Sequence, residues 1–163
     1  MTEDGGRKAE DRGRQLNTNM SERIMSFRDL RVYKTAFVLQ QRIFKTTKSF
    51  PREEIYSLTD QFRRASRSIG ANISEAWQKR RYLASFISKL SDSDGEQAET
   101  QHWIGTALAC DYISQAECDE MLDQCAEIGR MLGSMMAAPE KFCRVPPASR
   151  RPSSAVRPPS SGL

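Results

Sequence analysis

The sequence predicts an all-α protein, an antiparallel up-down-up-down four-helix bundle. Two observations support this fold class: apolar residues follow helical spacing in four segments, near 26–49, 51–78, 82–112 and 114–138, and the connections between these segments are short. Spacings of three and four place side chains on one face of a helix, and short connections make consecutive helices antiparallel neighbours. No strand pattern competes with this interpretation.

The first helix is expected from Ser26 to about Ser49. Ser26 with Asp29 suits a helix start, because a serine cap and an acidic residue in the first turn satisfy free backbone N–H groups. A wide apolar stripe follows, made of Leu30, Val32, Tyr33, Ala36, Phe37, Leu39, Ile43 and Phe44. This stripe predicts a helix that packs one face against the rest of the bundle.

The second helix, expected over 51–78, begins with a proline, which is tolerated at the first helical position, and two glutamates favour its positive dipole end. Its predicted inner face alternates spacings of three and four and consists of Ile55, Leu58, Phe62, Ala65, Ile69, Asn72 and Ala76. Such a seam is typical of left-handed bundle packing. We expect the Asn72 amide to fix the register and to hydrogen bond to Asp29 of the first helix.

The third helix, 82–112, has apolar ends but a polar middle, SDSDGEQAETQ at 91–101, which is unusual for a core helix. The fourth, 114–138, begins with a second capping box, Ser114 with Glu117. Its three-four seam consists of Cys118, Met121, Cys125, Ile128, Leu132 and Met135.

One domain, 26–138, is expected between two disordered tails, 1–25 and 139–163. The first tail is polar, and the second is rich in Pro, Ser and Arg and carries a net charge of +4. No run approaches the roughly 18 apolar residues of a membrane span, and the first tail has no apolar signal-peptide core. The sequence therefore predicts a soluble, cytoplasmic protein whose four cysteines are reduced.

Charge is divided along the chain. Residues 26–90 hold fourteen basic and five acidic side chains, whereas residues 91–138 hold one basic and ten acidic. Halves of opposite sign can attract each other between copies of the chain, which fixes orientation more than it adds affinity.

Residues suited to catalysis are scarce. His102 is the only histidine, and the chain has no P-loop, GxGxxG or GxSxG motif. The third helix has a single Glu-x-x-His, Glu99 with His102, whereas di-metal bundles need one from each of two helices. The sequence therefore predicts no enzyme, no metal and no cofactor; a metal site would require Glu96, Glu99 and His102 to meet in one pocket.

Four strings of residues resemble a known family. The most specific is QFRRASRSIGANISEA at Gln61–Ala76, supported by FRDLRVYKTA at Phe27–Ala36, FPREEIYSLTDQ at Phe50–Gln61 and ETQHW at Glu99–Trp103. Over about 26–138 the chain resembles the bacterial four-helix-bundle family of 23S rRNA intervening-sequence proteins. A related bundle is the accessory protein of diversity-generating retroelements, a basic pentamer that binds nucleic acid and a reverse transcriptase. The resemblance implies a homo-oligomer, a pentamer in the family's usual form, and a link to RNA.

Two basic groups are candidates for nucleic-acid contact. Arg63, Arg64 and Arg67 of the second helix can bind phosphates in a bidentate manner, or can pair with carboxylates of the third helix. If these helices turn back near residue 80, Arg64 lies beside Glu96, and Arg67 lies beside Asp92 or Asp94. The second group is at that turn: Lys79, Arg80, Arg81 and Tyr82.

Three cations followed by an aromatic ring suit phosphate binding and base stacking, but cations also stabilise a helix C-terminus. The favoured hypothesis is a non-enzymatic homo-oligomer that binds RNA or DNA through these basic residues. The alternative is a protein-assembly or adaptor component without nucleic-acid affinity, in which every arginine is paired and a partner protein is bound instead.

Overall fold

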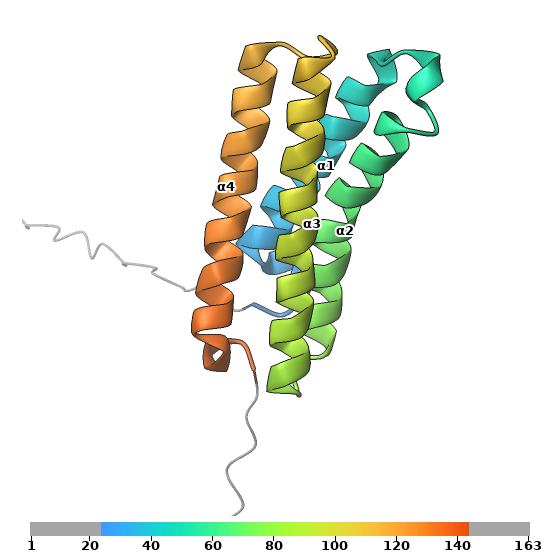
Figure 1. Ribbon diagram of the computed structural model, residues 1–163. Coiled ribbons are helices and arrows are strands. Elements are labelled where there is room, and N and C mark those ends of the chain that lie inside the picture. Colours follow the sequence, from blue (N-terminus) through green and yellow to red (C-terminus); the bar gives the residue numbers. More distant parts are fainter. Residues whose placement is uncertain (1–23, 144–163) are drawn as a thin grey trace, which may run out of the picture.

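A computed structural model describes residues 24–143, in which four α-helices pack side by side (Figure 1). The helices are α1 (Arg31–Thr46), α2 (Leu58–Gln78), α3 (Leu83–Ala109) and α4 (Gln115–Ala137). Both α1 and α3 pack against α2 and α4, which is the arrangement of an up-down-up-down bundle. The described part of the chain contains no strand, and the predicted fold class is confirmed.

A 3₁₀ turn, Phe27–Asp29, precedes α1, and the predicted capping box of Ser26 and Asp29 is present. The Asp29 carboxylate accepts hydrogen bonds from two backbone N–H groups at 2.9 and 2.8 Å, which hold its pKa below the usual value. The predicted bond between Asp29 and Asn72 is wrong: Asp29 caps its own turn through Oδ2, and the Asn72 side chain bonds to α3. The Asn72 Oδ1 atom instead accepts from the Lys89 ammonium at 3.4 Å.

The joint between α1 and α2 also differs from the prediction. A 3₁₀ turn, Arg52–Glu54, follows Pro51, and α2 begins only at Leu58. The Glu54 carboxylate accepts a hydrogen bond from the Leu58 N–H at 3.2 Å and so caps α2. Ile55, expected on the inner face of α2, lies in this joint and is 45% exposed.

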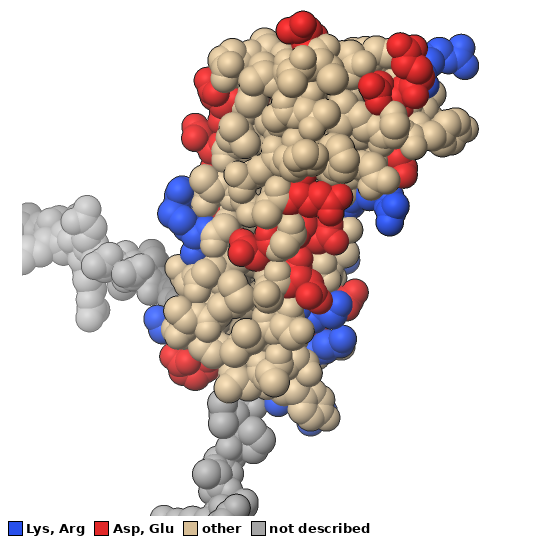
Figure 2. Space-filling view, viewed as in Figure 1, with Lys and Arg blue, Asp and Glu red and all other residues tan. Residues whose placement is uncertain are grey.

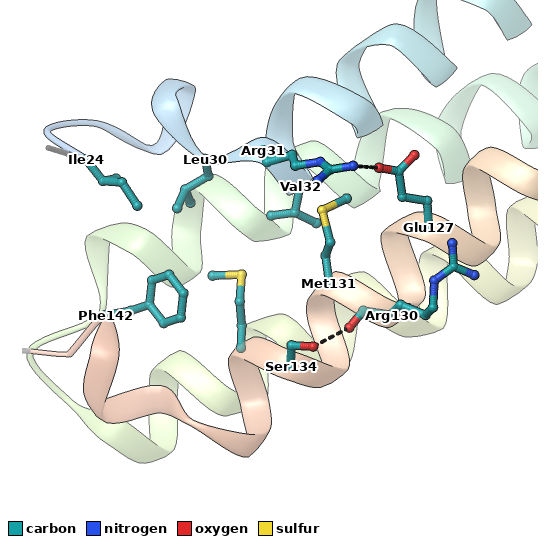
Figure 3. A pocket seen from close by; sticks show the side chains of 10 residues that line it. Ile24, Leu30, Arg31, Val32, Glu127, Arg130, Met131, Ser134 and Phe142 are labelled. Carbon is teal, nitrogen blue, oxygen red and sulfur yellow. Dashed lines mark hydrogen bonds and ion pairs between the residues drawn. The ribbon is translucent and has the colours of Figure 1, made fainter. Parts of the chain in front are cut away.

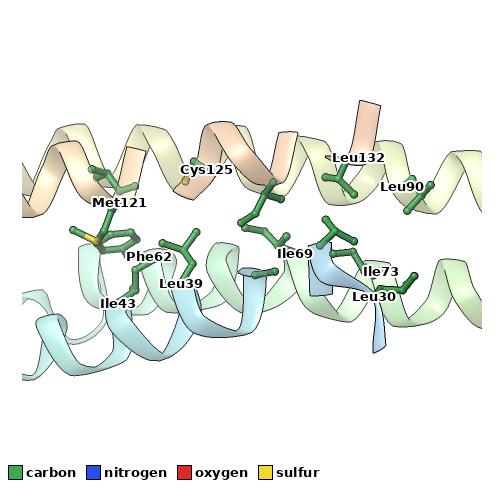
Figure 4. Packing of buried hydrophobic residues seen from close by; sticks show 14 of the residues in the cluster. Leu30, Leu39, Ile43, Phe62, Ile69, Ile73, Leu90, Met121, Cys125 and Leu132 are labelled. Atoms are coloured by element: carbon green, nitrogen blue, oxygen red, sulfur yellow. The ribbon is translucent and has the colours of Figure 1, made fainter. Parts of the chain in front are cut away.

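The core is a continuous layer of side chains from all four helices (Figure 4). All six residues of the predicted α4 seam are buried. In α2, five of the seven predicted inner residues are buried; Ile73 and Trp77 are buried in addition, whereas Asn72 is only half-buried. The inner face of α2 is therefore wider than a strict three-four seam.

The polar middle of α3 packs against its neighbours through a few buried side chains that bond to neighbouring backbones. The Ser93 hydroxyl donates to the Ile69 carbonyl of α2 at 2.9 Å. The Gln97 amide donates to the Cys125 carbonyl of α4 at 2.8 Å. Ser93 and Gln97 are 0% and 5% exposed, so this segment joins α3 to both neighbours.

The C-terminal end of α3 lies at Ala109, three residues before the predicted end at Tyr112. Asp111 has a left-handed backbone with φ of 59°, and the Tyr112 N–H donates to the Ala107 carbonyl at 2.9 Å. This geometry is a common way to end a helix, because it satisfies carbonyls that have no partner within the helix.

The packed body extends beyond the predicted boundary at residue 138. A 3₁₀ turn, Pro139–Lys141, follows α4, and Phe142 and Cys143 pack against the core. The rest of the two predicted tails, 1–23 and 144–163, lies outside the described residues. No helix in the described body is long and apolar enough to cross a bilayer.

Candidate nucleic-acid interface

Arg63 and Arg67 of α2 lie beside α1, whereas Arg64 is near Glu96 of α3. Arg63 is half-buried, and Arg64 and Arg67 are exposed. The guanidinium carbons of Arg63 and Arg67 lie 4.9 and 5.8 Å from the centre of the Phe44 ring. The ammonium of Lys48, which follows α1, lies 4.8 Å from the same ring. Three cations therefore surround one aromatic side chain, a grouping that the sequence pattern did not indicate.

The ion pairs expected between α2 and α3 are not formed. Within residues 24–143, no carboxylate lies within 4.0 Å of Arg64 or Arg67. Arg64 is near enough to Glu96 to lower its pKa, but burial and the charge of Glu99 outweigh this effect, so the pKa of Glu96 is raised. Arg64 and Arg67 thus form no ion pair with any residue of the described body.

The basic group at the α2–α3 turn divides into structural and exposed residues. Lys79 lies 4.0 Å from the Glu75 carboxylate, a weak contact of i,i+4 type. The Arg80 guanidinium donates to the Trp77 carbonyl at 2.6 Å and lies 4.1 Å from the Trp77 ring centre, so it caps the C-terminus of α2.

Arg81 and Tyr82 remain exposed at this turn, and Tyr82 is 68% exposed. The four residues do not form a single basic surface. Arg80 supports the helix end, whereas Lys79, Arg81 and Tyr82 are exposed.

Charge is partly neutralised where α1 meets α4. Arg31 forms an ion pair with Glu127 at 2.6 Å, and Arg42 pairs with Glu120. On the opposite side, acidic side chains gather over the middle of α3, and basic side chains border this patch toward α2 (Figure 2). Within residues 24–143 the charged halves of the sequence thus meet along the α1–α4 contact, and also within α3, where Lys89 pairs with Asp92 at 3.3 Å.

One side of α1 carries apolar side chains that the bundle leaves open. Phe37 and Val38 are 46% and 57% exposed. The Phe37 ring stacks on Tyr33 with centroids 6.2 Å apart. Tyr33 in turn covers Gly70 of α2, because a Cβ added to Gly70 would lie 3.5 Å from the tyrosine ring. The predicted apolar stripe of α1 is therefore split between the core and the surface.

A groove of about 670 Å³ lies between the start of α1 and the C-terminal half of α4 (Figure 3). Apolar side chains line most of it, among them Leu30, Met131 and Phe142. The ion pair of Arg31 and Glu127 lies at its edge. The groove contains no cluster of polar groups that would identify a small-molecule ligand.

The residues considered for metal binding or catalysis do not converge. His102 is exposed and lies against Trp103, with ring centroids 4.7 Å apart, and the Trp103 indole donates to Glu99 at 3.0 Å. Within the described body no group of three or more potential ligands could hold a metal ion. All four cysteines are free thiols, and only Cys110 is exposed.

Comparisons with known proteins agree with this fold. The family model described as 23S rRNA-intervening sequence protein matches residues 28–134. A crystal structure of a protein with unknown function from the S23 ribosomal protein family of Bacteroides thetaiotaomicron VPI-5482 has a TM-score of 0.59 and 28% sequence identity. The alignment covers 65% of this chain and 95% of that chain. No curated protein matches the chain.

The family match extends from the turn before α1 into the last turns of α4, and so includes every helix of the bundle. The strings that carry the resemblance in the sequence all lie wholly or almost wholly within it. The chain belongs to the family of 23S rRNA-intervening sequence proteins.

Proposed function

We propose that this protein is a non-enzymatic, homo-oligomeric module of the cytoplasm that binds nucleic acid through the basic surface of α2. The observation that carries the proposal is the lack of carboxylate partners: Arg63, Arg64 and Arg67 form no ion pair within residues 24–143. Guanidinium groups without an internal counterion are free to neutralise phosphates and to release the cations bound there.

The family description supports RNA as the first probe, since its name links the members to 23S rRNA. Tyr82 beside Arg81 supports a nucleic acid further, because it is 68% exposed and an exposed ring can stack on an unpaired base. At the α2–α3 turn, Arg81 and Tyr82 extend the proposed surface, whereas Lys79 and Arg80 contribute less because they already contact α2.

Fluorescence anisotropy of the full chain with a labelled structured RNA and a labelled duplex DNA tests this proposal. The variant Arg63→Gln, Arg64→Gln, Arg67→Gln is expected to bind more than about tenfold more weakly, since three phosphate contacts are lost. The matched control Arg150→Gln, Arg151→Gln, Arg157→Gln removes the same charge from the C-terminal tail.

An equal or larger loss in the tail control would show that the α2 surface is not the binding site. Absence of binding by the parent protein at low salt would favour the alternative function, an adaptor that binds only proteins. Circular dichroism of each variant shows whether the bundle is still folded.

Self-assembly is the second part of the proposal, and the exposed apolar side of α1 supports it. Exposed neighbouring apolar side chains are typical of protein–protein contacts, and Phe37 and Val38 lie next to each other there. We propose that this side is covered by another copy and that the assembly is a pentamer, the form the resemblance implies.

Sedimentation equilibrium should give five chains per particle, and the double variant Phe37→Glu, Val38→Glu should reduce the mass of the particle. The matched control is Ala98→Glu with Gln101→Glu, which adds the same two charges at exposed positions of α3, away from α1.

A further inference from the structure

Three cations gather around Phe44 without an anion between them. Lys48, Arg63 and Arg67 lie 4.8, 4.9 and 5.8 Å from the ring centre. Like charges on one helix at i,i+4 spacing repel each other, and Arg63 and Arg67 have this spacing. The ring face attracts cations but does not cancel their charge.

No described carboxylate neutralises this cluster. Lys48, Arg63 and Arg67 are absent from the ion pairs formed within 4.0 Å among residues 24–143. Asp60, one turn earlier on α2, is exposed and pairs with none of them. Among the described residues the site therefore has three positive charges and no carboxylate paired with them.

Arg63 is held in a fixed orientation by a buried hydroxyl. Thr47 is 3% exposed; its hydroxyl donates to the Ile43 carbonyl at 2.8 Å and accepts the Arg63 Nε–H at 2.8 Å. The Nε donor is thus used internally, while the terminal Nη groups make no hydrogen bond to the described residues. A guanidinium oriented in this way presents two N–H groups that match two oxygens of a phosphate.

We propose that Lys48, Arg63 and Arg67 bind adjacent phosphate groups of a nucleic-acid backbone, each cation neutralising one phosphate, with Thr47 as the positioning residue for Arg63. This inference rests on the proposed nucleic-acid binding and names the place where the backbone is held. Lys48 and Arg67 are exposed, so the site is open enough for a continuous chain. Arg64, also exposed, is the next cation on α2 and can contact an adjacent phosphate.

The test follows the Arg63 Nε–H resonance in NMR spectra of the 15N-labelled full chain. A hexanucleotide of uridine and inorganic phosphate are titrated separately. The Arg63 resonance should shift and saturate with the RNA, whereas free phosphate at the same concentration should leave it nearly unchanged. A single phosphate lacks the neighbouring contacts that the backbone supplies.

Two variants separate the positioning of Arg63 from the charge of the site. Thr47→Val should weaken RNA binding about fivefold with an unchanged salt slope, because no cation is removed; Thr47→Ser should restore the affinity. Lys48→Gln, at an exposed position, should leave the fold intact by circular dichroism and should lower the slope of log K against log salt by about 0.7.

Each other outcome overturns a defined part of the inference. If RNA binds but the Arg63 resonance does not shift and Lys48→Gln leaves the salt slope unchanged, the phosphate site is wrong while the proposed function stands. If inorganic phosphate saturates the site as tightly as RNA, the site binds free anions rather than a backbone. If RNA does not bind at low salt, the proposed function fails together with the site.

Discussion

Three glycines in the interior of the helices face open space, which makes their replacement a quantitative test of the fold. Gly95 and Gly105 of α3 and Gly133 of α4 are exposed, and a Cβ added to any of them would meet no atom within 4 Å. Alanine stabilises a helix interior by about 0.8–1 kcal/mol relative to glycine. Since the three sites are well separated, we expect the triple variant to gain about 2.5 kcal/mol, or about 10 °C in Tm.

Urea unfolding followed by circular dichroism at one protein concentration measures this gain. The matched control is Ala98→Gly, an exposed position of α3, which should lose about 1 kcal/mol. A loss of stability at any single glycine would refute the reasoning, because it would mean that another surface covers that site in solution.

Three further results are expected. Ile69→Asp should unfold the bundle, as Ile69 is fully buried and an unpaired charge cannot be accommodated there; a folded variant would contradict the core assignment. Burial and the charge of Glu99 raise the pKa of Glu96 in the folded protein. Protonated Glu96 therefore stabilises the fold at acid pH, and this stabilisation is lost as the pH rises through the raised pKa. Glu96→Gln should therefore raise Tm at pH 7 and leave it unchanged near pH 3, which thermal scans at both pH values can show. Thiol titration with Ellman's reagent should give one rapid equivalent, from exposed Cys110, because burial raises the pKa of the Cys125 thiol to about 12 and the other cysteines are buried too.

The fold was predictable from sequence where packing repeats regularly. The α4 seam from Cys118 to Met135 is buried throughout, and the capping box of Ser114 and Glu117 is present. Both signals are local: helical periodicity fixes the buried face, and the cap fixes the first turn. The start of α2 was not predictable in this way, because Glu54 caps it across a 3₁₀ turn that has no periodic pattern.

The candidate site was predictable only in part. Pairing α2 with α3 about a turn placed Arg64 near Glu96, and the structure confirms that these two side chains influence each other. Whether an ion pair forms depends on the rotamers of long side chains, which a helical register does not determine. The hydrogen bond from Arg63 to Thr47 joins two helices across a joint, so no spacing in the sequence signalled it.

The salt dependence of RNA binding tests the central proposal most directly. The slope of log K against log salt is measured for the parent chain and for the variant Arg63→Gln, Arg64→Gln, Arg67→Gln between about 50 and 200 mM salt. Each phosphate contact contributes about 0.7 to the slope for single-stranded RNA, so the variant should be shallower by about 2. Identical slopes would contradict the proposal that these three arginines hold the nucleic-acid backbone.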